Sequence, residues 1–228
     1  MNNKSLIKNL LSGFAVLALT TALISCKKND VDEFGSANLK VVNASPASSP
    51  QGFFLANSTV IKGSLAYGDE SDYIVTNSGN NLEAQFRNDG SSAAYATSKF
   101  EFNNGKNYSI FLAGDGQAAR IKVFTDDMIA PAAGQAKVRF IHLSDAAPTR
   151  IDIKNGSGDN LVVNLERDNS SNYVTLAPGI LSMNVYGANQ TTSLGNYNVT
   201  AFLANKIYTV YITGTTIDDI EVHQLSHN

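Results

Sequence analysis

The sequence predicts an all-β protein with two tandem immunoglobulin-like antiparallel β-sandwiches, and three observations support this. Apolar residues alternate with polar ones, as in Tyr208, Val210 and Ile212, which is typical of half-buried strands. Clusters of Asn, Gly and Pro separate the alternating runs, and such clusters are turn signals. Finally, the pattern recurs along the chain at an offset of about 100 residues.

The recurrence predicts two related domains. Residues 105–114 match residues 205–214 without a gap, with Lys, Tyr and the closing Gly identical. Further colinear matches at nearly the same offset support this division. We therefore expect one sandwich at 36–128, a linker at 129–135 and a second sandwich at 136–228.

The clearest alternation lies in the second domain, where each run is bounded by turn residues such as Asn155-Gly156 and Pro178-Gly179. The predicted strands there lie near 138–144, 150–154, 161–166, 181–186 and 206–214. Short strands at this spacing indicate a sandwich of immunoglobulin type. The single Cys and the absence of Trp exclude the disulfide and core Trp of antibody domains, so the likeness is architectural.

The N-terminal 25 residues have the pattern of a signal peptide and are excluded from fold reasoning. The apolar stretch at 10–24 is shorter than the roughly 20 residues that cross a bilayer. It ends on Leu23-Ile24-Ser25-Cys26, which resembles a bacterial lipobox. The resemblance implies cleavage between Ser25 and Cys26 and lipid attachment at Cys26. The alternative is an ordinary secretory signal or membrane helix with an incidental Cys.

A polar run follows, so residues 26–35 are predicted to be a lipidated Cys and a flexible tether. Lys28-Asn29-Asp30 partly resembles the lysine-then-acid export signal of Bacteroidetes lipoproteins, with Asn29 where that signal prefers an acid. We expect a protein anchored by lipid to the outer membrane and exposed at the cell surface. A periplasm-facing protein is the alternative.

Composition excludes several classes of function. A net charge of −3 and only 16% charged residues leave no basic patch for nucleic acid. One Cys cannot form an internal disulfide or a multi-thiolate metal site. We predict no metal and no cofactor.

The start of the second domain carries a family resemblance. Val-Arg-Phe-Ile-His-Leu-Ser-Asp-Ala-Ala-Pro at 138–148, followed by Asp152, resembles the opening of the DUF4397 family. The likeness covers most of residues 136–225. The first domain has Asn43 in place of the His and is interpreted as a degenerate copy. The resemblance implies secreted or surface β-domains, often in tandem, without an established activity.

Two candidate polar sites have structural alternatives. A hydrogen bond between His142 and Asp152 could orient an imidazole for catalysis, or only satisfy a polar group at a sheet end. We favour the structural interpretation, and do not expect His223 and His227 to form a metal site. Acidic clusters could bind Ca²⁺, but they lack an Asp-x-Asp-x-Asp-Gly loop and are interpreted as turn residues. They are Asp126-Asp127, Asp218-Asp219 and residues 68–72.

Three aromatic residues lie opposite the apolar positions of their strands and are the predicted ligand surface: Tyr186, Tyr211 and Phe111. Such rings stack on sugars, although packing against a covered sheet face is the alternative. The sequence therefore predicts a non-catalytic binding, adhesion or structural role, with a glycan or an envelope protein as partner. An accessory hydrolase using loop carboxylates or His142 with Asp152 is the alternative function.

Overall fold

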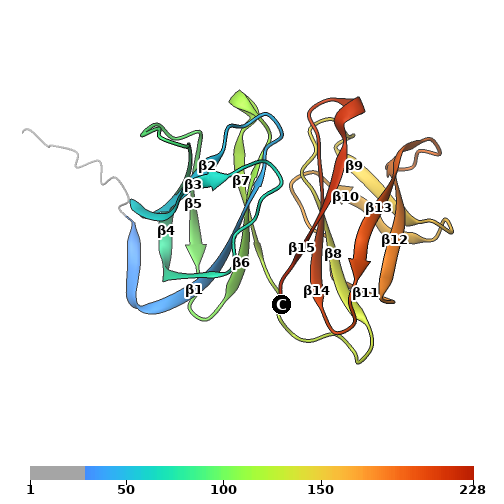
Figure 1. The fold of residues 1–228 in the computed structure, drawn as a ribbon, viewed down its shortest axis with the longest axis horizontal. Helices are drawn as coiled ribbons and strands as arrows, with labels where there is room; N and C mark the ends of the chain where they lie inside the picture. The colour runs from blue at the N-terminus through green and yellow to red at the C-terminus, as the bar shows by residue number, and fades with distance from the viewer. Residues whose placement is uncertain (1–28) are drawn as a thin grey trace, which may run out of the picture.

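The computed structural model describes residues 29–228, which fold into two β-sandwiches that lie side by side (Figure 1). The strands of the N-terminal sandwich are β1 (Asp30–Ala44), β2 (Gln51–Leu55), β3 (Ser58–Leu65), β4 (Ile74–Asn88), β5 (Ala96–Phe102), β6 (Asn107–Ala113) and β7 (Arg120–Thr125). Those of the C-terminal sandwich are β8 (Ala136–His142), β9 (Arg150–Asn155), β10 (Asn160–Glu166), β11 (Val174–Leu176), β12 (Gly179–Gly187), β13 (Ser193–Phe202), β14 (Ile207–Thr213) and β15 (Glu221–Ser226). The predicted all-β fold class is confirmed.

The C-terminal sandwich consists of two four-stranded sheets, with strand orders β10-β9-β12-β13 and β11-β8-β14-β15. Alternate residues of both sheets point inward and form an apolar core that includes Phe140, Ile153 and Val210. The prediction of purely antiparallel sheets needs one correction. The first strand of each sandwich pairs in parallel with its second-to-last strand, β1 with β6 and β8 with β14.

The N-terminal sandwich has the same arrangement, but its two layers are joined. β4 is 15 residues long and corresponds in position to both β11 and β12. Its middle contains Ser78, where the C-terminal sandwich has Pro178 between β11 and β12. A proline lacks the N–H that a strand interior donates, which explains the break there. An origin of the two halves as copies stays a prediction.

The flexible tether predicted for residues 26–35 is corrected over its second half. β1 begins at Asp30, and Asp30, Val31 and Asp32 pair with Asn80, Gly79 and Ser78 of β4. This polar stretch belongs to the sheet because backbone pairing needs no apolar side chains. Cys26 and the predicted signal peptide lie outside the described residues.

Two short 3-10 helices, η1 (Gly116–Ala118) and η2 (Ile217–Asp219), precede β7 and β15. Between Asn29 and the C-terminus, no helix is long and apolar enough to cross a membrane. The predicted linker at 129–135 lies in the connection from β7 to β8.

Candidate functional site

The two sandwiches pack through an apolar interface between β1, β6 and β7 on one side and β8, β14 and β15 on the other. Its buried members are Val42, Ala44, Phe111, Ala113, Ile141, Leu143, Tyr211 and Leu225. The rings of Phe111 and Tyr211, at matching positions of β6 and β14, meet edge to face with centroids 5.2 Å apart. These strands are therefore covered on both faces, by their own core and by the neighbouring sandwich.

The prediction that Phe111 and Tyr211 form an exposed ligand surface is wrong. Phe111 is 0% and Tyr211 1% exposed, because the second face of their strands lies in the interface. Tyr211 also stacks on the ring of His223, 4.9 Å away. Of the three predicted aromatic residues only Tyr186 reaches the surface, where it is half-buried under the Lys154 ammonium group, 5.0 Å from its ring.

One edge of the interface contains a buried ion pair that the sequence interpretation missed. The side chains of Arg139 on β8 and Asp126 after β7 are 2% and 0% exposed, and the guanidinium donates to the carboxylate. Arg139 also donates to the Thr125 carbonyl at 2.9 Å and to the Thr209 hydroxyl at 2.8 Å. The Ser109 hydroxyl donates to Asp126 at 2.9 Å. The charges are thus paired and hydrogen-bonded, as burial requires.

His227 completes this network by linking its two ends. Its Nε2 lies 2.7 Å from the Thr209 hydroxyl, and its Nδ1 lies 2.7 Å from the Tyr73 hydroxyl. Tyr73 donates to Asp126 at 2.7 Å, so its oxygen is left to accept from Nδ1–H. Thr209 accepts from Arg139 and therefore donates to Nε2. These directions assign a neutral imidazole protonated at Nδ1.

Because the histidines are buried, we expect the free energy of unfolding to decrease as the pH falls from 6.5 towards 4. Burial lowers the pKa of His227 to about 4, so the unfolded chain binds a proton in this range that the folded chain does not. His227 alone should lower the free energy of unfolding by about 3 kcal/mol over that range. Burial also lowers the pKa of His142 and His223, which acts in the same direction.

Urea unfolding of the parent and His227→Gln at pH 7 and pH 4.5 measures this effect. The parent should lose more stability than the variant between the two pH values. The difference between the two losses isolates His227, because other titrating groups contribute equally to both proteins. Glu70, whose pKa is raised by burial, is one such group. Equal losses in both proteins would contradict the assignment of a neutral His227.

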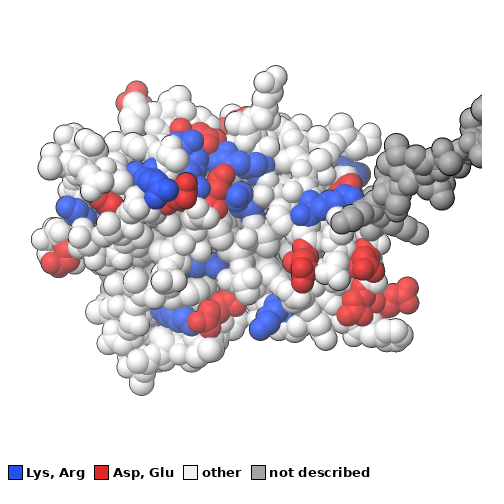
Figure 2. All heavy atoms as spheres, turned by 180° about the vertical axis from the view of Figure 1, so that it is seen from behind, with Lys and Arg blue, Asp and Glu red and all other residues white. Residues whose placement is uncertain are grey.

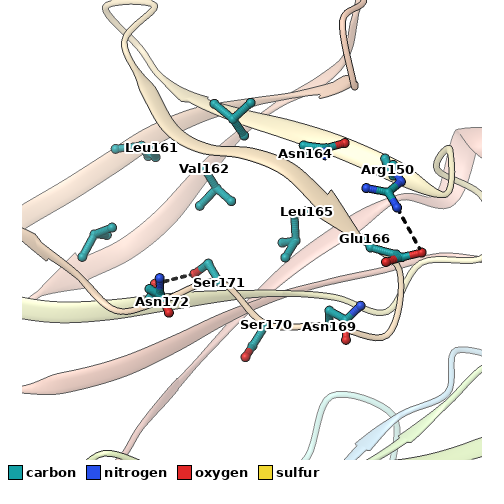
Figure 3. A pocket seen from close by; sticks show the side chains of 12 residues that line it. Arg150, Leu161, Val162, Asn164, Leu165, Glu166, Asn169, Ser170, Ser171 and Asn172 are labelled. Atoms are coloured by element: carbon teal, nitrogen blue, oxygen red, sulfur yellow. Dashed lines mark hydrogen bonds and ion pairs between the residues drawn. The ribbon is translucent and has the colours of Figure 1, made fainter.

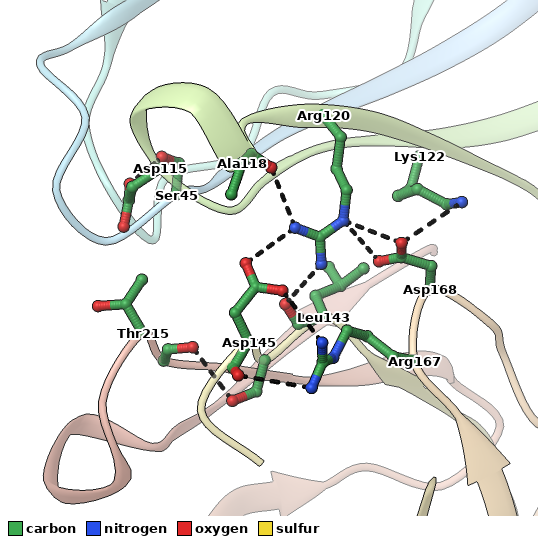
Figure 4. Close-up of polar contacts among 12 residues, drawn as sticks. Ser45, Asp115, Ala118, Arg120, Lys122, Leu143, Asp145, Arg167, Asp168 and Thr215 are labelled. Atoms are coloured by element: carbon green, nitrogen blue, oxygen red, sulfur yellow. Dashed lines mark hydrogen bonds and ion pairs between the residues drawn. The ribbon is translucent and has the colours of Figure 1, made fainter. Parts of the chain in front are cut away.

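The opposite edge of the interface contains a more open ionic cluster (Figure 4). Arg120 of β7 donates from Nε to both carboxylate oxygens of Asp168, at 2.8 and 2.9 Å, and from Nη1 to Asp145 at 2.9 Å. Lys122 lies 3.8 Å from Asp168, and Arg167 lies 3.7 Å from Asp145. Ion pairs therefore hold both edges of the apolar interface.

The acidic clusters considered for Ca²⁺ have other partners. Asp126 is occupied by Arg139, and Asp127 pairs with Lys137 at 2.7 Å. The Asp219 carboxylate accepts from the backbone of Thr215 and Thr216. Within residues 29–228 no group of three or more His, Cys, Asp and Glu side chains could hold a metal.

The structure does not bring His142 and Asp152 together, which corrects the basis of the hydrolase alternative. His142 Nε2 lies 2.9 Å from the Pro148 carbonyl, and its buried Nδ1 has no hydrogen-bond partner. Asp152 accepts from the backbone of Asn164 at 2.7 Å and Asn189 at 3.2 Å. The two residues belong to opposite sheets, because the connection from β8 to β9 crosses the sandwich.

An open groove lies on the C-terminal sandwich between β10 and residues 169–174, with a volume of about 530 Å³ (Figure 3). Val162 and Leu165 point into it from β10. The Arg150–Glu166 ion pair, 3.5 Å long, lies at one end. The polar side chains that line the groove are Arg150, Asn164, Glu166, Asn169, Ser170, Ser171 and Asn172. This lining combines an aliphatic strip with hydrogen-bonding groups, and none of its described members is aromatic.

The N-terminal sandwich has a groove of about 550 Å³ between the start of β3 and the start of β4. Its lining is more aliphatic and includes Val60, Ile74 and Val75. The start of β1 contributes Val31 and Glu33 to it. The two grooves therefore differ in character, and the C-terminal one is the more polar.

Surface charge is mixed on the face shown in Figure 2, where basic and acidic side chains lie next to one another. That face lacks the continuous basic stripe of a nucleic-acid-binding surface.

Fold, interface and groove define an all-β protein of two packed sandwiches. The chain belongs to the DUF4397 family, described as a domain of unknown function, whose model matches residues 37–154, slightly more than half of the chain. The match includes residues 138–152, whose motif suggests the family, but it begins in the N-terminal sandwich and does not reach the likeness predicted beyond residue 154. It covers the N-terminal sandwich, interpreted from the sequence as a degenerate copy, from Ala37 of β1 onward, together with β8 and most of β9. No curated protein matches the chain significantly.

Three solved structures illustrate the comparison with known folds. A family 26 carbohydrate-binding module of Eubacterium rectale Amy13K, in complex with maltoheptaose, is 10% identical with a TM-score of 0.29, over 82% of this chain and 96% of that chain. The pneumococcal glycogen-degrading virulence factor SpuA is 12% identical with a TM-score of 0.28, over 83% and 21%. A candidate cell adhesion protein of Bacteroides uniformis is 12% identical with a TM-score of 0.26, over 86% and 98%.

Proposed function

We propose that this protein is a non-catalytic binding module of the cell envelope and that the groove beside β10 is its ligand site. The groove itself is the observation that supports this proposal. It is open, and it presents amide, hydroxyl and charged groups over an aliphatic strip. The interface between the sandwiches serves a different purpose, because its aromatic and ionic groups are used in holding the two halves together.

A glycan is the proposed ligand. A sugar chain offers many hydroxyl groups that both donate and accept, and the groove contains amides such as Asn169 and Asn172 that do the same. The exposed Arg150–Glu166 pair adds charged partners, which form stronger hydrogen bonds than neutral ones. Because the residues that line the groove include no ring for stacking, we expect binding to depend on hydrogen bonds.

Membrane attachment through Cys26, with the protein at the outer surface of the outer membrane, is part of this proposal. The lipobox-like residues Leu23-Ile24-Ser25-Cys26 and the partial export signal after them support it. A periplasm-facing orientation remains the alternative. The hydrolase alternative has no support from His142 and Asp152, whose hydrogen bonds go to different parts of the sandwich.

A glycan array probed with residues 27–228 tests the ligand class. We expect saturable binding that falls about tenfold in Asn172→Ala and in Glu166→Ala, the loss typical of one removed hydrogen bond to a ligand. Tyr186→Ala is the matched control, because Tyr186 lies on β12 outside the groove.

Two results would contradict the proposal. Binding lost in Tyr186→Ala and kept in both groove variants would move the site to the outer face of β12. An array without any bound glycan would reject the carbohydrate ligand and favour a protein partner or a structural role. Crosslinking on intact cells would then identify the partner.

A further inference from the structure

The folded part of the chain begins very close to the predicted lipid attachment site. Asn29 is already held to the sandwich, because its side-chain oxygen accepts from the backbone N–H of Glu83 at 2.7 Å. From Cys26 to Asn29 an extended chain covers at most about 10 Å. A lipid on Cys26 would therefore hold the start of β1 within that distance of the bilayer surface.

The same end of the sandwich presents an apolar side chain to solvent. Phe34 is 98% exposed, the most exposed of the large apolar residues of the described chain. It lies at a bulge in β1, between Asp32 and Ser36. Both sides of the bulge are fixed, since Asp32 accepts from the Phe34 N–H and Asn104 accepts from the Ser36 N–H, each at 3.0 Å. Phe34 is thus held outward by the fold.

Two further aliphatic residues belong to this end. Val31 and Val75 are both exposed and both line the N-terminal groove. The segment 27–34 contains two lysines, Lys27 and Lys28, and three acidic residues, Asp30, Asp32 and Glu33. The charges of the segment nearly balance, so an uncharged, zwitterionic lipid surface suits it better than a strongly anionic one.

We propose that Phe34 inserts into the interfacial region of the membrane to which Cys26 is anchored, with the exposed Val31 three positions before it in the same strand. The proposal rests on the lipid attachment proposed above. Apolar side chains placed at the headgroup boundary strengthen the binding of a protein that already has a lipid anchor. The N-terminal sandwich then lies against the bilayer, and does not move freely on a tether.

This arrangement has a consequence for the ligand groove. In Figure 1, β1 begins on the side of the N-terminal sandwich that faces away from the C-terminal sandwich. With the start of β1 on the membrane, the C-terminal sandwich lies farther from the lipid than the N-terminal one. The N-terminal sandwich acts as a rigid spacer.

The absence of Trp from the chain provides a direct test. Phe34→Trp introduces a single indole at a fully exposed position, so folding should be unaffected. The full-length lipidated variant is placed in phosphatidylcholine vesicles with or without brominated acyl chains. The emission maximum of Phe34→Trp in vesicles should lie at shorter wavelength than that of the same protein in buffer without vesicles. Brominated lipid should reduce the emission intensity by about half. Ile217→Trp, at an exposed site on η2 of the other sandwich, is the matched control and should be neither shifted nor quenched.

Mass spectrometry of the same preparations, together with Cys26→Ser, separates two kinds of failure. If Cys26 carries lipid and Phe34→Trp behaves like Ile217→Trp, membrane contact by Phe34 is rejected and the anchoring stands. If Cys26 carries no lipid and neither protein sediments with the vesicles, both the anchoring and the contact are rejected. Quenching of Phe34→Trp alone, in lipidated protein only, is the result that supports the inference.

Discussion

Arg139→Met is expected to lower the free energy of unfolding by about 3–5 kcal/mol, the range for removal of one partner of a buried ion pair. Methionine keeps the unbranched apolar part of the side chain, so the main loss is the charge and the hydrogen bonds of the guanidinium group. The Asp126 carboxylate would remain buried without its guanidinium partner. Thr209 and the Thr125 carbonyl would lose a donor as well.

Arg150→Met is the matched control for this experiment. Arg150 pairs with Glu166 at 3.5 Å, and their side chains are 49% and 48% exposed. Exposed pairs contribute at most about 1 kcal/mol, so urea unfolding should show a much smaller change. Similar losses in the two variants would mean that Arg139 is not buried in solution and that the interface is open.

Phe111→Ala is expected to cost a similar amount, about 3–5 kcal/mol, as for other large side chains removed from cores. Phe111 is fully buried between the sandwiches, with its ring 5.2 Å from Tyr211 and 5.8 Å from Phe124. The substitution leaves a cavity in the interface, and neither rigid sheet can close it. Thermal or urea unfolding followed by circular dichroism measures the loss.

Phe34→Ala, in the protein free of membranes, is the control for Phe111→Ala. Phe34 is the same residue type but fully exposed, and surface substitutions usually change stability by less than about 0.5 kcal/mol. A loss below about 1 kcal/mol in Phe111→Ala would contradict the apolar interface. Phe111 and Tyr211 would then be accessible to a ligand.

Most strands of the C-terminal sandwich could be predicted because their evidence is local. The alternating run near 150–154 corresponds to β9 at Arg150–Asn155, and the run near 206–214 corresponds to β14. In both, period two follows directly from the geometry of an extended chain. Segment 30–35 was missed because its strand pairing with β4 has no apolar pattern to reveal it.

The candidate site was less predictable because it depends on which faces are covered. Alternation in β14 separates Tyr208, Val210 and Ile212 from Tyr211, but both sets are buried. A signal for the second covered face was present in Arg139, a charged residue between the apolar residues Val138 and Phe140. Charged residues are almost never fully buried unless paired, but the sequence does not show that Asp126 is the partner.

The pairing of His142 with Asp152 failed for a topological reason. Strands that are adjacent in sequence are often neighbours in a sheet, and the prediction relied on this. Here β8 belongs to one sheet and β9 to the other. The groove beside β10 also depends on topology. β10 belongs to one sheet, and the segment on the other side of the groove leads into β11 of the other sheet.

The sequence by itself determined that this chain forms short strands in two similar halves, since side-chain alternation and turn residues act over a few neighbouring positions. Only the tertiary structure decided that Phe111, Tyr211 and Arg139 are interior residues and that β10 lines an open groove. Burial of a strand's second face depends on what packs against it. That contact joins residues about 100 positions apart, beyond the reach of any local pattern.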